Sequence, residues 1–235
     1  MNTSKLKKIA FLGVLALVAG GVFSALLTQY SKAAANVNIQ QGVVLRAYDS
    51  SNNMLAESDF DTPIDLTATV TAGDALTQFQ VSGQNVNYFT IEYLASNPQV
   101  NAPVELVIEL NNEASTYEGL FKEFLEYRIY FGTDKSTAPA IKIYENSGSP
   151  AVNGLNSVLC SGSGSSFTCD LDGDNTDTSD QFTVEVDTTN LKITLSGNYF
   201  TLKGDHTSVN FILEPVVNPA TQPGTYTVNL YVNPR

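Results

Sequence analysis

The stretch NVNIQQGVVLRAY, residues 36–48, decides the fold of this chain, because polar and apolar side chains alternate along it. Val37 and Ile39 stand between polar residues, Gly42 interrupts the alternation, and apolar residues resume at Val43. A period of two is typical of a β-strand with one buried face, and a glycine inside such a pattern indicates a bulge. We therefore expect strands at 36–40 and 43–48, separated by a bulge at Gly42.

The same pattern continues to the end of the chain, with turn-forming residues between short apolar runs. The further strands that we expect are 65–70, 76–81, 88–94, 104–110, 127–131, 140–144, 181–186, 191–195, 209–213 and 225–232. No βαβ repeat connects them. The sequence therefore predicts an all-β fold, an antiparallel β-sandwich of the jelly-roll or immunoglobulin-like kind.

One segment departs from this period. In TYEGLFKEFL, residues 116–125, the side chains of Tyr117, Leu120, Phe121 and Phe124 recur at helical spacing. This spacing predicts one short helix packed on the sheets. No linker is long enough to divide the chain, so residues 36–235 are expected to form a single domain.

The N-terminus has the pattern of an export signal. Lys5, Lys7 and Lys8 precede an apolar run at 9–27, which predicts a signal peptide over residues 1–24. Cleavage before Ala25 is favoured, because the peptidase acts at the membrane surface just beyond the apolar run. Cleavage before Asn36 is the alternative, and a retained transmembrane anchor is a further one.

The charge balance excludes nucleic acid as a partner. The chain has 12 Lys and Arg against 24 Asp and Glu, a net charge of −12. Removing residues 1–24, with three lysines and no acid, makes it −15. Affinity for phosphate comes largely from Lys and Arg, so neither nucleic acid nor anionic lipid is an expected partner, and the membrane is met only during export. The expected localisation is extracellular.

Motifs for catalysis are also missing from the sequence. The chain has one histidine, His206, and neither a G-x-S-x-G nor an H-E-x-x-H motif. Glycosidase carboxylate pairs have no fixed spacing, but sugar clefts commonly carry Trp, and the chain has none. These observations predict a protein that is not an enzyme and that needs no cofactor.

The two cysteines, Cys160 and Cys169, bracket a short Ser/Gly-rich segment. A close pair in an exported chain predicts a disulfide across a hairpin. A metal pair is the alternative, and no histidine or third cysteine stands nearby to support it.

An acidic segment follows the second cysteine. Residues 170–180 contain five aspartates, and calcium takes six to eight oxygen ligands. The EF-hand pattern fails, because Asn175 stands at its glycine position and Gln181 at its glutamate position. We therefore predict a solvated loop without metal, with a calcium site through Asp170, Asp172 and Asp174 as the alternative.

The segment ALLTQYSKAAA, residues 25–35, would form an N-terminal arm. Exposed, Leu26, Leu27 and Tyr30 would invite aggregation. The arm could be an edge strand of its own subunit or frayed, but we favour a donor strand that joins a neighbour's sheet. Such a contact is heterologous and builds an open filament. The donor residues are Ala25, Leu26, Leu27, Thr28, Gln29, Tyr30, Ser31 and Lys32.

The N-terminal order also resembles a known family. The basic start, LALVAGGVFSALL, Ser31-Lys32 and the strand start Gly42-Val43-Val44-Leu45 together resemble the TasA/camelysin-type biofilm matrix fibre proteins, especially the archaeal bundling pilins. The resemblance covers residues 5–48. It implies an exported jelly-roll subunit, trimmed by signal peptidase and polymerised by donor-strand complementation, with residues 25–32 as donor and the core face of the first strands in the acceptor groove.

The expected function is thus a secreted subunit of a pilus or biofilm matrix fibre, a head-to-tail homopolymer able to bundle laterally. A type IV-like pilin that keeps residues 9–27 as a helix is one alternative. A cell-surface or S-layer-type binding module using the 170–180 loop is another, and a secreted hydrolase with dispersed acids is a third.

Overall fold

The computed structural model describes residues 42–58, 63–71, 77–94, 101–111, 124–217 and 223–235. The chain divides into two compact units, residues 1–40 and 41–235, and all described residues belong to the second. The predicted signal peptide, the arm and the strand at 36–40 lie outside the described residues. Within the described part, no helix has the length and apolar character needed to cross a membrane.

Every regular element of the described part is a β-strand. The strands are β1 (Val43–Tyr48), β2 (Met54–Ser58), β3 (Ile64–Val70), β4 (Phe79–Val81), β5 (Gln84–Asn85), β6 (Tyr88–Tyr93), β7 (Ala102–Asn111), β8 (Phe124–Tyr130), β9 (Ala140–Asn146), β10 (Ser149–Leu155), β11 (Leu159–Ser163), β12 (Ser166–Asp170), β13 (Gln181–Asp187), β14 (Lys192–Leu202), β15 (Ser208–Val217) and β16 (Gly224–Pro234).

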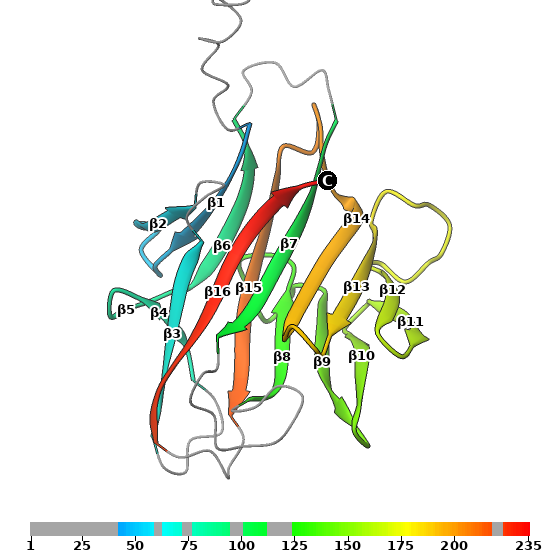
Figure 1. The fold of residues 1–235 in the computed structure, drawn as a ribbon. Coiled ribbons are helices and arrows are strands. Elements are labelled where there is room, and N and C mark those ends of the chain that lie inside the picture. Colours follow the sequence, from blue (N-terminus) through cyan, green and yellow to red (C-terminus); the bar gives the residue numbers. More distant parts are fainter. Residues whose placement is uncertain (1–41, 59–62, 72–76, 95–100, 112–123, 218–222) are drawn as a thin grey trace, which may run out of the picture. The chain divides into compact units, whose positions relative to one another are not determined.

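The strands form two large antiparallel sheets. One has seven strands in the order β10-β9-β8-β15-β6-β1-β2, and the other has nine in the order β11-β12-β13-β14-β7-β16-β3-β4-β5. The chain changes sheet several times, for example from β2 to β3 and from β14 to β15 (Figure 1). The predicted all-β antiparallel sandwich is confirmed, and crossing connections of this kind fit a jelly roll.

The core lies between the sheets and is formed by alternate residues of the strands. In β3, the side chains of Ile64, Leu66, Ala68 and Val70 are buried, whereas those between them are partly or fully exposed. The buried residues of both sheets form one hydrophobic cluster. The alternation of polar and apolar residues in the sequence therefore predicts which face of each strand is buried.

The predicted helix at 116–125 is wrong where it can be examined. Phe124 and Leu125 begin strand β8, and residues 116–123 lie outside the described residues. Phe124 and Tyr127 are both buried, three residues apart, because the ladder of β8 with β15 shifts register between Val216 and Val217. A bulge adds one residue to a strand. The helix prediction rested on Tyr117, Leu120, Phe121 and Phe124, and only Phe124 lies among the described residues.

The bulge predicted at Gly42 borders residues 36–41, which lie outside the described residues, and it stays a prediction. Gly42 immediately precedes β1, and its carbonyl accepts a hydrogen bond of 2.7 Å from the Leu94 N–H. A bulge that the sequence did not predict lies in the ladder of β1 with β2, where the register shifts between Ala47 and Tyr48.

Two glycines shape the connections at the end of the sandwich that leads to β11. Between β9 and β10, Ser147 and Gly148 both have positive φ, 54° and 80°, which is the requirement of a type I′ hairpin turn. After β10 the chain turns so closely that a Cβ on Gly154 would lie 1.9 Å from the Val158 carbonyl oxygen. Gly154 thus permits the passage from the seven-stranded sheet to β11.

Candidate functional site

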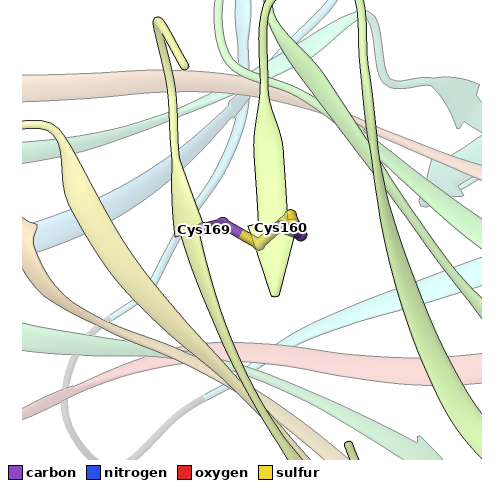
Figure 2. The surroundings of a disulfide bond; sticks show 2 residues. All are labelled: Cys160 and Cys169. Carbon is purple, nitrogen blue, oxygen red and sulfur yellow. A yellow bond between two sulfur atoms is a disulfide. The ribbon is translucent and has the colours of Figure 1, made fainter. Parts of the chain in front are cut away.

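The disulfide hairpin of β11 and β12 begins the candidate site. Cys160 and Cys169 lie directly opposite each other in the ladder, with a Cα–Cα distance of 4.1 Å, and they form the predicted disulfide (Figure 2). The side chain of Cys169 is fully buried, and that of Cys160 packs against the core from a partly exposed position. The predicted disulfide is confirmed, and it links β11, the last strand of the nine-stranded sheet, to the neighbouring strand β12.

The acidic segment starts where β12 ends. Asp170 is the buried member, 3% exposed, and its carboxylate accepts hydrogen bonds from the Gly173 N–H at 2.7 Å and the Gln181 side-chain amide at 3.2 Å. A buried carboxylate needs such partners. Asp170 therefore closes the base of the loop between β12 and β13.

Asp172, Asp174 and Asp177 are exposed and bond locally, and Asp180 is partly buried. Asp174 accepts from the N–H and hydroxyl of Thr176, and Asp177 does the same with Ser179. These bonds stabilise the charged forms and lower the pKa of both carboxyls. For Asp172, a bond from the Asp174 N–H lowers the pKa, but desolvation and repulsion by Asp174 and Asp180 outweigh it, and the net pKa is raised.

The structure brings the three alternative calcium ligands together. One carboxylate oxygen each from Asp170, Asp172 and Asp174 lies within 4.8 Å of the others. Desolvation, followed by repulsion from Asp174 and Asp180, raises the pKa of Asp172 in this grouping. Exposed aspartates also gather without any metal, so the cluster alone does not identify a ligand, and the prediction of a metal-free loop stays a prediction.

A polar cavity that the sequence did not reveal lies beside this loop. It has a volume of about 550 Å³, and its lining includes Asp180, Tyr199, Lys203, Asp205 and His206. Four of them lie within residues 199–206, and Asp180 comes from the loop before β13. The only signal for the site was the single histidine of the chain.

His206 and Tyr199, which both line this cavity, contact each other through a hydrogen bond and through their rings. The Nε2 atom of His206 lies 2.8 Å from the Tyr199 carbonyl oxygen, and the two rings are 5.5 Å apart. Burial raises the pKa of the Tyr199 phenol to about 12. The cavity offers carboxylates, hydroxyls and an ammonium group to a polar ligand.

The predicted donor residues cannot be placed next to these features. Residues 25–32 lie outside the described residues, so the structure neither joins them to a sheet nor separates them from one. Of the predicted site residues, it places the two cysteines and the three aspartates in neighbouring positions on β11, β12 and the loop that follows.

Comparison with known proteins adds one distant likeness. No family model matches the chain, and no curated protein matches it. A solved structure of a GH131 β-glucanase catalytic domain from Podospora anserina is similar, at 10% identity over 72% of this chain and 70% of that one, with a TM-score of 0.28.

This match overturns the prediction that the chain is not an enzyme, because the similar structure is a catalytic domain. The prediction rested on missing motifs and missing Trp, and neither separates a catalytic β-sandwich from one without activity, since function depends on the site rather than the fold. At a TM-score of 0.28 the likeness carries no argument for glucanase activity either.

Proposed function

We propose that this chain is the exported subunit of an extracellular filament of the TasA/camelysin kind. In this proposal residues 25–32 of one copy add a strand to a sheet of the next copy. Because donor and acceptor are different parts of the subunit, the contact is heterologous, and repeating it builds an open fibre.

The observation that carries the proposal is the extent of the described sandwich. Its sixteen strands and its core cluster come from residues 43–234, which lie wholly after the arm. Each sheet nevertheless ends in an edge strand at both sides. Within the described ladders, each edge strand is hydrogen-bonded to another strand on one side only. An apolar arm ahead of such a domain, and open edges on it, are the two parts that strand addition needs.

Two further features support export and the arm's role. A disulfide stabilises proteins in oxidising compartments, and Cys160 and Cys169 form one. In addition, the first acid of the chain is Asp49, so the arm is free of the negative charge that covers the rest. Burying Leu26, Leu27 and Tyr30 on another subunit would contribute roughly 1.5–3 kcal/mol each.

N-terminal sequencing of the exported protein is the first test. We expect the mature chain to begin at Ala25. A mature chain that starts at Asn36 would lack the donor strand, and this would refute the proposal. A start near Ile9 would favour the type IV-like pilin instead.

The second test deletes residues 25–32 from the full chain and examines the product by electron microscopy. Filaments should disappear, because no donor remains. The matched control replaces Thr28 and Gln29 by serine, which leaves the apolar side chains of the arm in place and should leave filaments intact. Filaments that persist unchanged after the deletion would refute the donor-strand model.

A further inference from the structure

The polar cavity beside the acidic loop is formed by three neighbouring parts of the sandwich. They are the end of the loop between β12 and β13, the last part of β14, and the turn that follows β14. In Figure 1 this loop lies beside β13 and β14. The residues that matter for binding are Asp180, Tyr199, Lys203, Asp205 and His206. A volume of about 550 Å³ is within the range of pockets that hold small molecules.

Hydrogen bonds hold these three parts together. The side-chain amide of Asn198 on β14 donates to the Thr178 carbonyl of the loop at 2.8 Å. Lys203 and His206 exchange two backbone hydrogen bonds of 2.9 Å across the turn, and His206 is bonded to the Tyr199 carbonyl. The cavity is therefore formed before a ligand arrives, and preformed walls lower the entropy cost of binding.

Three polar groups of the cavity residues have no partner in the described part of the protein. Neither the Lys203 ammonium, the Asp205 carboxylate nor the Tyr199 hydroxyl forms a hydrogen bond or an ion pair with a described residue. Burial alone raises the pKa of Tyr199 to about 12, so its phenol has lost water without gaining a protein partner. A tyrosine hydroxyl that is removed from water usually has such a partner, and a ligand in the cavity would supply it.

The mixture of donors and acceptors selects the kind of ligand. The Lys203 ammonium only donates, whereas the carboxylates of Asp180 and Asp205 only accept. Because a carbonyl can only accept, Nε2 of His206 donates to Tyr199, and Nδ1 of the neutral ring is a further acceptor. A ligand that satisfies all these groups must both donate and accept, which is the property of hydroxyl groups.

Charge argues against the other classes of polar ligand. An anion would meet the carboxylates of Asp180 and Asp205, and an organic cation would be repelled by Lys203 and could not accept its hydrogen bonds. For a metal ion, the grouping of ligand atoms in the described residues is that of Asp170, Asp172 and Asp174, and none of these lines the cavity. A neutral ligand is left.

An aromatic surface accompanies these polar groups. The Tyr199 ring packs against the rings of Phe131 and Phe200 at centroid distances of 5.5 and 5.4 Å, and against His206 at 5.5 Å. These contacts fix the orientation of the ring. The C–H face of a sugar ring is apolar and packs on aromatic side chains, while the hydroxyls at its rim reach polar groups.

We propose that this cavity binds a neutral saccharide, with Lys203 donating to its hydroxyls, Asp205 accepting from them and Tyr199 contacting the sugar ring. The inference is independent of the filament proposal, because these residues belong to the described sandwich and not to the arm.

Isothermal titration calorimetry of the full chain with cellohexaose, maltohexaose and mannohexaose tests the proposal. At least one of these neutral probes should bind. The double variant Lys203→Met, Asp205→Asn should bind that probe at least about tenfold more weakly, because hydrogen bonds to charged groups are the stronger ones. Both side chains are exposed and the turn is held by its backbone, so the variant should fold.

A matched control removes the same two charges elsewhere. Lys142→Met with Glu185→Gln changes β9 and β13, away from the cavity lining, and also leaves the net charge unchanged. This control should bind as tightly as the natural protein. Circular dichroism compares the folding of the two double variants.

Tyr199→Phe isolates one hydroxyl. It keeps the aromatic packing and should weaken binding by about three- to tenfold, the effect of losing one hydrogen bond. An unchanged urea midpoint at pH 7 verifies that the variant is folded.

Three results would overturn the inference. The first is no binding of any of the three probes up to about 10 mM, a concentration at which even weak sites are occupied. The second is binding that the cavity variant leaves unchanged or that the control weakens equally, because the site would then lie elsewhere. The third is tighter binding of hexagalacturonate, an anionic saccharide, which would contradict the neutral ligand class.

Discussion

Tyr199 shows how one partly buried group links the polar cavity to the stability of the fold. Its phenol has a pKa of about 12 because burial disfavours the charged form, against an ordinary value near 10. Between these two pH values the unfolded chain releases the proton first. The folded state is therefore fully stabilised below pH 10 and loses stability as the pH rises toward 12.

The Tyr199→Phe substitution should remove this loss. Two pKa units correspond to about 2–3 kcal/mol, so the urea midpoint of the natural protein should fall between pH 10 and pH 12 by more than that of the variant. Both proteins measured at pH 7, where the phenol is neutral in both states, give the baseline. Parallel decline of the two curves would show that Tyr199 does not carry the alkaline transition.

At the scale of the element, period two predicted strands where one face is buried. Residues 43–48 were expected as a strand and form β1, and the expected strand at 65–70 lies within β3. The prediction failed at Phe124 and Leu125, which were assigned to a helix and instead begin β8, where the ladder with β15 contains a bulge. It also passed over β10, because the sequence reads Ser149-Pro150 as part of a turn and the ladder with β9 extends to those residues.

The β11–β12 hairpin should depend on its disulfide more than on its side chains. Four of the five β11 residues are exposed, so packing holds the strand weakly. The cysteines are nine positions apart, and closing a loop of that size stabilises by about 2–3 kcal/mol in the chain-entropy model. Replacing both cysteines by serine should lower the free energy of unfolding by that amount.

Reductant provides the control for this hairpin. Thermal unfolding of the natural protein should fall to the level of the Cys160→Ser, Cys169→Ser variant when dithiothreitol is added, and the variant should not respond. A variant as stable as the natural protein would mean that the ladder with β12 holds β11 without help.

At the scale of the molecule, the sequence predicted the sandwich and the disulfide but not the cavity beside the acidic loop. Sandwich and disulfide follow from local patterns, namely alternation and a close pair of cysteines. The cavity joins Asp180 from the loop before β13 to Tyr199 on β14 and His206 on the turn before β15. Such a meeting depends on how a loop, a strand and a turn pack together, and no spacing in the sequence encodes it.

At the scale of the molecule, the net charge of the subunit determines how assembly responds to ionic strength. Without residues 1–24 each subunit carries −15, so copies repel one another. Raising ionic strength from 0.01 M to 0.15 M shortens the screening length from about 30 Å to about 8 Å. Assembly followed by light scattering should therefore become faster, since salt screens the repulsion between whole subunits. Assembly that slows with salt in the natural protein would show instead that complementary charges at the contact dominate the repulsion.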